Sequence, residues 1–483
     1  MKLTFYGAAR QVTGSNYLLE LDGEKILIDC GLHQGSSFVE KQNFDPFPYD
    51  PKEISAVIVT HPHVDHIGLL PKLYKDGFRG IVLSTPPAKD FGNLLLLDSE
   101  HILIEAAERF RMPYLYGVRE VEELMTRWQT AEYLQPTKVG KFTVTFYNAG
   151  HILGSAFVVI DCPSSVIARS EATKQSYKSP DEIATSATEV GTRNDGTVRI
   201  LFSGDLGNSP APIIGKRQDP PEDVDYCVVE STYGNRTHEP AVERKSVLED
   251  MIEDTVRRKG ILMIPAFAME RTQELLYELN ELVENDRIPK VPIYLDSPLA
   301  IKLTEVYNRH HKYWDAASMK QMKSGDALFK FPGLRMTLTT EESKHINKIP
   351  PPKVIIAGAG MSNAGRILHH EKLYLSDPNN SLLIIGYQAE GTLGRRLLNG
   401  EKEVSIHGEK IAVRCQIKTI GGYSAHADQP QLLEWLGPIR QKVKTVFLTH
   451  GEGDNQTGLK QKLIDDLAVN VEIPALGDSY DII

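Results

Sequence analysis

Four side chains that can bind metal ions, His61, His63, Asp65 and His66, lie within six residues of one another. Imidazole nitrogen favours zinc and similar ions, and a carboxylate can bridge two of them. The cluster follows the apolar run at residues 55–60, which predicts a buried strand. The spacing suits two ions better than one. The alternative is a group of surface histidines, which the preceding apolar strand argues against.

Three further residues of the same chemistry follow other predicted strands. His151, Asp205 and His450 each come directly after an apolar run, with a glycine nearby. Glycine lets the backbone pass close to an ion. A single histidine after a strand is more often a packing or capping residue, but three such strand ends together favour one shared metal site.

The elements that must position these residues alternate between strands and helices, which predicts a layered α/β protein. A second helix-and-strand block follows at about residues 240–414, and the last segment returns to strand, helix and strand. The expected strands are 17–21, 25–29, 56–60, 80–84, 142–148, 156–161, 197–202, 226–230, 260–264, 292–295, 353–357, 381–385, 443–449 and 469–473, and the expected helices are 65–76, 89–111, 119–129, 240–259, 270–284, 298–311, 365–373 and one from about 458.

Length and composition narrow the class of protein. A chain of 483 residues, 41% hydrophobic, favours more than one domain. No apolar stretch is long enough for a membrane helix, and the N-terminus lacks the apolar block of a signal peptide, so we expect a cytoplasmic protein without membrane contact. The four cysteines, Cys30, Cys162, Cys227 and Cys415, are scattered, which argues against disulfides and a thiolate zinc site. The net charge of -10 does not indicate nucleic-acid binding, although bound metals can supply local positive charge.

Residues 163–196 differ in amino-acid composition from the rest of the chain. They are rich in Ser, Thr, Ala and charged residues, and show no sustained period. They separate two predicted strands, 156–161 and 197–202, that would otherwise form a hairpin. We therefore expect a flexible insertion, with a functional loop as the alternative.

The motifs together resemble one known family. They are Leu27-Ile-Asp29-Cys30-Gly31, His61-x-His63-x-Asp65-His66, the segments around His151 and Asp205, Glu230-Ser-Thr-Tyr-Gly234, Ser424-Ala-His426-Ala-Asp428 and Thr449-His450-Gly451. Their order resembles the β-CASP branch of the metallo-β-lactamase superfamily. The match looks closest to the bacterial and archaeal ribonucleases similar to the cleavage subunit of the pre-mRNA 3′-end processing complex, and it extends over nearly the whole chain.

This resemblance implies the architecture. It implies a metallo-β-lactamase αββα sandwich at residues 1–234 and 422–483; the expected flexible insertion at 163–196 has no recognised counterpart in the family. It also implies an inserted α/β β-CASP cap domain at residues 235–421, with the active site between the two domains.

The resemblance also implies a role for each site residue. Two Zn²⁺ ions are expected, with Mn²⁺ as an in vitro substitute. Asp29 would orient a ligand histidine. His426, paired with Glu230, would donate a proton to the leaving oxygen, with Asp65 as a further catalytic residue. The ligands would be His61, His63, His151 and Asp205 for one ion and Asp65, His66, Asp205 and His450 for the other.

The expected activity is hydrolysis of RNA phosphodiester bonds to 3′-hydroxyl and 5′-phosphate ends, by endonuclease action, 5′-exonuclease action or both. His450 favours RNA, because DNA-directed relatives usually lack a histidine at that position. A homodimer is expected, since relatives are often dimers.

The glycine-rich segment at residues 353–366 allows two interpretations. It resembles a dinucleotide-binding fingerprint, but its third glycine is misplaced. The better interpretation is that its backbone N–H groups receive RNA phosphates. The expected substrate contacts are Arg271, Gly360, Ser362, Arg366 and His369, with Lys344, Arg395 and Arg396 extending the track and His370 as a contact or a helix-end residue.

Two other functions remain open from the sequence. One is a hydrolase of a small ester, thioester or cyclic nucleotide, which would not require a cap as large as residues 235–421. The other is a non-catalytic RNA-binding subunit, which the complete set of expected metal ligands argues against.

Overall fold

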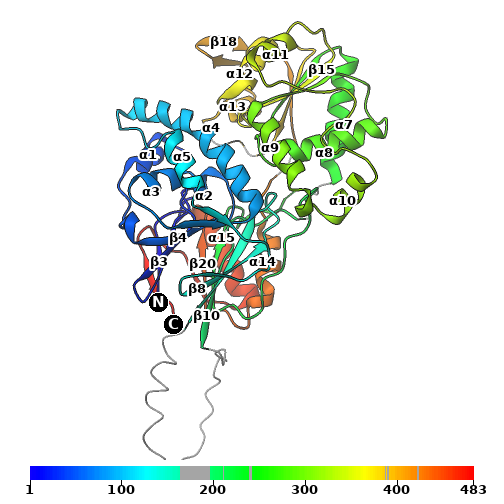
Figure 1. The fold of residues 1–483 in the computed structure, drawn as a ribbon. Helices are drawn as coiled ribbons and strands as arrows, with labels where there is room; N and C mark the ends of the chain where they lie inside the picture. The colour runs from blue at the N-terminus through cyan, green and yellow to red at the C-terminus, as the bar shows by residue number, and fades with distance from the viewer. Residues whose placement is uncertain (164–195, 210, 239–241, 387, 389–390, 421–423) are drawn as a thin grey trace, which may run out of the picture. The chain divides into compact units, whose positions relative to one another are not determined.

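The computed structural model describes residues 1–163, 196–209, 211–238, 242–386, 388, 391–420 and 424–483 (Figure 1). The chain divides into two compact units. Unit 1 comprises Met1–Ser209, Arg217–Thr237 and His426–Ile483, and unit 2 comprises Pro210–Lys216 and His238–Ala425. The short segment Pro210–Lys216, which we expected in the first domain, belongs to unit 2.

Unit 1 contains two seven-stranded sheets. Sheet 1 runs, in spatial order, through β22 (Ser479–Asp481), β1 (Lys2–Phe5), β2 (Tyr17–Leu21), β3 (Glu24–Ile28), β4 (Ile54–Ile58), β5 (Ile81–Ser84) and β6 (Trp128–Thr130). Sheet 2 runs through β21 (Val471–Glu472), β20 (Thr445–Thr449), β11 (Tyr226–Glu230), β10 (Thr197–Phe202), β9 (Ala156–Pro163), β8 (Phe142–Asn148) and β7 (Thr137–Val139).

The two sheets pack face to face, with helices on both outer faces. Phe5 of sheet 1 and Phe202 and Phe447 of sheet 2 share one buried core. A second core joins the other face of sheet 1 to its helices, and a third joins sheet 2 to α14 and α15 (Figure 1). This four-layer order confirms the predicted αββα sandwich. The helices are α1 (Ser37–Lys41), α2 (Val64–Ile67), α3 (Leu70–Lys75), α4 (Pro86–Phe110), α5 (Val118–Met125), α14 (Gln429–Leu436) and α15 (Gly453–Leu467).

Some predicted elements of unit 1 are wrong in extent. The helix expected at 65–76 is interrupted between α2 and α3. There the Leu69 amide donates to the Cys30 carbonyl at 2.9 Å, and Pro71, in the first turn of α3, has no N–H to continue the helix. The helix expected at 119–129 ends at Met125, since β6 begins at Trp128. The last helix begins at Gly453, earlier than predicted.

The strands on either side of the predicted insertion are direct partners. β9 and β10 pair antiparallel, with Pro163 opposite Thr197. The strands therefore form the hairpin that the sequence indicated. The predicted flexible segment between them lies outside the described residues, except at its two ends.

Unit 2 is built on a parallel sheet. β12, β15 and β16 are buried at every position, as expected for strands covered on both faces. The six strands are, in spatial order, β14 (Leu334–Met336), β13 (Ile293–Asp296), β15 (Lys353–Ala357), β12 (Ile261–Pro265), β16 (Ser381–Ile385) and β19 (Gln416–Ile420), and β17 (Glu403–Ile406) with β18 (Glu409–Ala412) forms a separate hairpin. The helices are α7 (Val242–Arg257), α8 (Arg271–Glu284), α9 (Pro298–Arg309), α10 (Ala316–Lys323), α11 (Thr340–Ile346), α12 (Gly365–Tyr374) and α13 (Leu393–Leu398).

Within the described part of the chain, we find no helix that is both long enough and apolar enough to cross a membrane.

Burial of Glu371 on α12 predicts a pH-dependent stability. Its side chain is fully buried with a hydrogen bond from Ser362, and burial raises its pKa to about 8. Between about pH 4.5 and pH 8 the folded state retains a proton that the unfolded chain releases, so local stability should fall as pH rises, by up to about 1.4 kcal/mol per pH unit. Hydrogen exchange of α12 amides should show this fall.

Replacing Glu371 by Gln should flatten the dependence, because glutamine does not titrate. Glu305 on α9 is exposed, and E305Q is the matched control. Equal pH slopes in wild type and E371Q would contradict the assignment.

Candidate metal centre

The metal-binding candidates of unit 1 all lie on connections at strand ends. His61, His63, Asp65 and His66 occupy the turn from β4 into α2. His151 follows β8, Asp205 follows β10 and His450 follows β20. Neighbouring ends of packed strands bring these four connections together, although they are spread over residues 61–450 of the sequence.

Two non-glycine residues at strand ends of unit 1, one after β3 and one after β20, lie in the left-handed region. Asp29 has φ 59° and His450 has φ 49°. Such conformations are uncommon and persist where the surrounding structure holds them. Here the Asp29 amide donates to the Ile58 carbonyl and the His450 amide to the Ala8 carbonyl. The two side chains are thereby directed by backbone hydrogen bonds.

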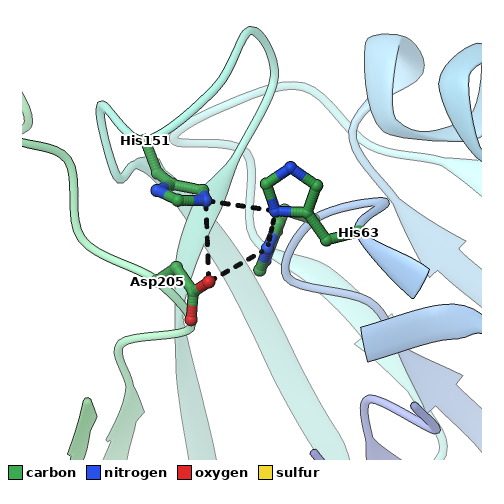
Figure 2. A group of neighbouring side chains, drawn as sticks. His63, His151 and Asp205 are labelled. Carbon is green, nitrogen blue, oxygen red and sulfur yellow. Dashed lines mark hydrogen bonds and ion pairs between the residues drawn. The ribbon is translucent and has the colours of Figure 1, made fainter. Parts of the chain in front are cut away.

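The first ligand group consists of His61, His63, His151 and Asp205, whose ligand atoms all lie within 4.8 Å of one another. His63 Nδ1 lies 3.0 Å from His61 Nε2 and 3.2 Å from His151 Nε2, and Figure 2 shows His63, His151 and Asp205 directed toward one another. Asp205 Oδ2 lies 3.3 Å from His61 Nε2 and 3.5 Å from His151 Nε2.

The second group consists of Asp65, His66 and His450. His66 Nε2 and His450 Nε2 lie 3.3 Å apart, and His450 Nε2 is 3.3 Å from Asp65 Oδ2. The other carboxylate oxygen of Asp205, Oδ1, lies 3.3 Å from His66 Nε2 and 3.6 Å from His450 Nε2. Asp205 therefore faces the first group with one oxygen and the second group with the other.

The donor set fits bound cations. Burial lowers the pKa of His61 to about 4 and that of His63 to about 3, so both rings are neutral at pH 7. Nδ1 of a neutral imidazole has either one N–H or one lone pair, and two nitrogens converge on His63 Nδ1, so no tautomer gives both contacts a separate linear hydrogen bond. Asp205 Oδ1 is buried without a hydrogen-bond partner. A cation in each group would satisfy these atoms.

In the second group, nearby carboxylates raise the pKa of the histidines, whereas in the first group burial lowers it. Burial lowers the pKa of His66, but Asp205, Asp29 and Asp65 outweigh it and leave that pKa well above its usual value. Burial likewise lowers the pKa of His450, and Asp205 and Asp65 again raise it. The negative charge of these carboxylates, which favours a proton on the two rings, also favours a metal cation beside them.

Asp29 orients one of the ligand candidates. Its carboxylate lies 2.7 Å from His66 Nδ1 and accepts hydrogen bonds from the Thr60 amide and hydroxyl, each at 2.8 Å. The ring of His66 is thus held with Nε2 toward Asp205. This is the geometry of a carboxylate behind a metal-binding histidine.

His426 and Glu230 form a pair at the edge of the ligand groups. His426 Nδ1 lies 3.0 Å from Glu230 Oε2 and 3.8 Å from Asp205 Oδ2. Glu230 also accepts a hydrogen bond from the Leu206 amide at 2.6 Å. Burial lowers the pKa of His426, but Glu230 and Asp205 outweigh it and raise the pKa to about 9.

The five expected substrate contacts lie in unit 2, and three have internal partners. Arg271 is buried in an ion pair with Glu274, and Ser362 donates to the buried Glu371. Glu270, before Arg271, has φ 64°, a backbone conformation that favours glycine. These buried partners compete with a substrate, so the predicted contacts of Arg271 and Ser362 would require a local rearrangement.

The other three expected contacts differ in exposure. Arg366 donates to Asp296 at 2.7 Å and to the carbonyls of Thr337 and Leu338. Gly360 is buried, and a Cβ at that position would lie 2.6 Å from the ring of Phe267. His369 is exposed and stacks on His407, with ring centroids 4.9 Å apart. Of the five, His369 alone has an exposed side chain.

Two residues beside the ligand groups had no role predicted from the sequence. The Thr232 hydroxyl lies 3.1 Å from His450 Nδ1, and the Ser203 hydroxyl accepts from the Glu230 amide at 3.0 Å. Thr232 belongs to the Glu230–Gly234 motif, which was the available signal. Ser203 had none, because its contact depends on the pairing of β10 with β11.

The four-layer sandwich and the two ligand groups at its strand ends define a metallo-hydrolase. Family models agree with this class. A metallo-β-lactamase superfamily domain matches residues 18–171, a Beta-Casp domain matches 272–397, and a Zn-dependent metallo-hydrolase RNA specificity domain matches 410–474.

Relatives are similar over nearly the whole chain. Ribonuclease TTHA0252 of Thermus thermophilus is 36% identical over 463 residues, which are 96% of each chain. Transcription termination factor FttA of Methanosarcina mazei is 31% identical, over 94% of this chain and 67% of that protein. A solved protein of unknown function from Enterococcus faecalis V583 shares the fold at 12% identity, with a TM-score of 0.50 over 99% of both chains. The chain belongs to the β-CASP family of the metallo-β-lactamase superfamily.

The contacts of Asp29 predict its effect on metal binding. Replacing Asp29 by Asn removes the negative charge behind His66 and should weaken zinc binding by about 10- to 100-fold. Competition with a chromogenic chelator measures this affinity. Asp50, an exposed carboxylate that accepts from the Lys52 amide, provides the control D50N. Unchanged zinc affinity in D29N would contradict the role.

Proposed function

We propose that this protein is a zinc-dependent ribonuclease that hydrolyses RNA phosphodiester bonds to 3′-hydroxyl and 5′-phosphate ends. The observation that carries the proposal is the position of Asp205 between two histidine-rich ligand groups, with the His426–Glu230 pair beside them. The similarity over almost the full length to a protein named a ribonuclease supports RNA as the substrate.

The ligand groups suggest how two ions would be held. His61, His63, His151 and Asp205 would hold one, and Asp65, His66, Asp205 and His450 the other. The nitrogen and oxygen donors suit zinc, with Mn²⁺ as an in vitro substitute. Two such ions, when bound, would activate a water molecule and neutralise charge on the phosphate.

The protein side chains account for the proton transfers. His426 is charged at neutral pH by virtue of its raised pKa, and Glu230 faces its Nδ1. The opposite nitrogen, Nε2, therefore has the proton that the departing 3′-oxygen requires. Asp65, whose side chain is 16% exposed, is proposed to accept the proton of the attacking water as well as to bind metal.

A polymeric substrate agrees better with the size of unit 2 than a small ester, thioester or cyclic nucleotide does. Its six-stranded sheet and its helices far exceed what enclosing a small molecule requires. The full set of ligand candidates also supports an enzyme over a non-catalytic RNA-binding subunit. A homodimer in the cytoplasm remains our expectation, and light scattering tests the subunit number.

Labelled RNA distinguishes the proposed modes of cleavage. Substrates labelled at either end, with a 5′-monophosphate or a 5′-triphosphate, should give internal fragments for an endonuclease and mononucleotides for a 5′-exonuclease. Faster turnover of thioesters or cyclic nucleotides than of RNA would overturn the assignment of substrate. Fewer than two zinc ions per chain would favour the non-catalytic alternative.

Two substitutions separate the proton donor from the ligands. H426A should retain both zinc ions and lower cleavage by about 10²- to 10⁴-fold, because the leaving oxygen loses its proton donor. D205N should instead lose zinc, because it removes the shared negative charge. Metal analysis and single-turnover cleavage measure the two effects.

The control is H101A, since the side chain of His101 on α4 is 84% exposed. Normal turnover by H426A would exclude its role as the proton donor, and a full zinc content in D205N would exclude Asp205 as the shared ligand.

A further inference from the structure

Arg217 is a buried cation in unit 1 whose partners are backbone carbonyls. Its side chain is nearly inaccessible, with 5% of the residue exposed. Nη1 donates to the Gly207 carbonyl and Nη2 donates to the Gln431 carbonyl, each at 2.9 Å. Among the described residues, no carboxylate lies within ion-pair distance of its guanidinium. A buried charge satisfied by two carbonyls is uncommon, so its position needs a reason.

The first carbonyl belongs to the connection that carries Asp205. Gly207 lies two residues after Asp205, and its amide donates to the Ala149 carbonyl at 2.9 Å. A Cβ on Gly207 would lie 1.7 Å from the Gly150 carbonyl oxygen, so the two connections are in direct backbone contact. A shift of Gly207 would therefore move Asp205 and the connection that carries His151.

Arg217 also contacts the His151 connection through its own backbone. A Cβ on Gly150 would lie 2.9 Å from the Arg217 amide nitrogen. The next residue, Gln218, donates its amide to the Asn148 carbonyl at 2.9 Å, and its side-chain oxygen accepts from the Asn148 amide at 2.7 Å. The residues before His151 are thus paired with the segment that begins at Arg217.

The second carbonyl belongs to the segment that carries His426. Gln431 lies in the first turn of α14, where the Asp428 side chain caps the helix by accepting from the Gln431 amide. The backbone of His426 forms a bridge with Gly207, and the Ala427 amide donates to the Leu206 carbonyl at 2.7 Å. The Arg217 guanidinium therefore contacts both bridged segments, the one that carries Asp205 and the one that carries His426.

We infer that Arg217 is a positioning residue for the proposed cleavage reaction, fixing the His151, Asp205 and His426 connections relative to one another. The inference rests on the proposed function for its kinetic consequence. Three connections from distant parts of the chain meet at this one residue: its backbone contacts the His151 connection, and its Nη1 and Nη2 donate to the other two. The planar fork suits this task, since it fixes two acceptors at a set spacing.

The guanidinium remains charged in surroundings that lower its pKa. Burial lowers the pKa of Arg217 by more than Glu434, Asp219, Asp428 and Glu230 raise it, but an arginine side chain is not deprotonated in proteins. A neutral side chain of similar length would fill the space but remove the hydrogen bonds that Nη1 and Nη2 donate to the Gly207 and Gln431 carbonyls. We then expect a small shift of the connections relative to one another.

Replacing Arg217 by Met tests the inference. R217M should bind RNA with KM changed less than about 3-fold and lower kcat by about 10- to 100-fold, because small misplacements of reacting groups act on the chemical step. R217K, which retains a charged donor, should recover much of kcat. Kinetics are normalised to folded protein by circular dichroism.

A spectroscopic measurement tests the same inference without RNA. Co²⁺ alone is bound to the metal-free protein, and its visible absorption reports the arrangement of the ligands. The spectrum of R217M should differ from that of wild type, and that of R217K should resemble wild type. R79M is the matched control, because Arg79 also donates to two backbone carbonyls, those of Tyr74 and Phe78, away from the ligand groups.

Failure of the role of Arg217 and failure of the proposed function give different results. A folded R217M with wild-type kcat and a wild-type Co²⁺ spectrum would overturn the inference, and so would equal losses in R217M and R79M. If R217M does not fold, R217Q is judged by the same criteria. A wild-type protein that does not cleave RNA would overturn the proposed function, while the Co²⁺ spectra would still decide the role of Arg217.

Discussion

A buried carboxylate between two clusters of imidazoles is the constraint on which unit 1 depends. Burial raises the pKa of Asp205, but His450, His66 and His61 outweigh it, so the group remains charged although only 2% of it is exposed. A charge in that position is stable only when cations or donors surround it on both sides. The ligand groups supply that surrounding, and the two sheets must end where Asp205 can reach both.

The sandwich meets this requirement by placing the connections at the ends of rigid, buried strands. Phe5, Phe202 and Phe447 pack in the shared core of the two sheets, and that core fixes where β10 and β20 end. The connections beyond the strand ends then adopt uncommon conformations, as at Asp29 and His450, because backbone hydrogen bonds hold them. The strands therefore fix the positions of the ligand residues, and the connections fix the directions of their side chains.

In unit 2, charged residues form structural contacts between elements of the fold. Asp296, at the end of β13, accepts hydrogen bonds from Arg366, Thr337 and Ser343 and pairs with the buried His370, which holds its pKa low against burial. These donors tie β13 to α11 and α12. Charged residues that were predicted to face a substrate thus have structural partners, which a pattern of residue types cannot distinguish from free ones.

The sequence by itself determined the class of the protein, because ligand types, their spacing and the apolar runs before them are local properties. The His61–His66 cluster, the strand ends at His151, Asp205 and His450, and the layered α/β order were all predictable. Only the tertiary structure decided which side chains are available. The burial of Arg271 and Ser362, the contact of Thr232 with His450 and the carbonyl partners of Arg217 arise from segments far apart in the chain, whose approach no local pattern encodes.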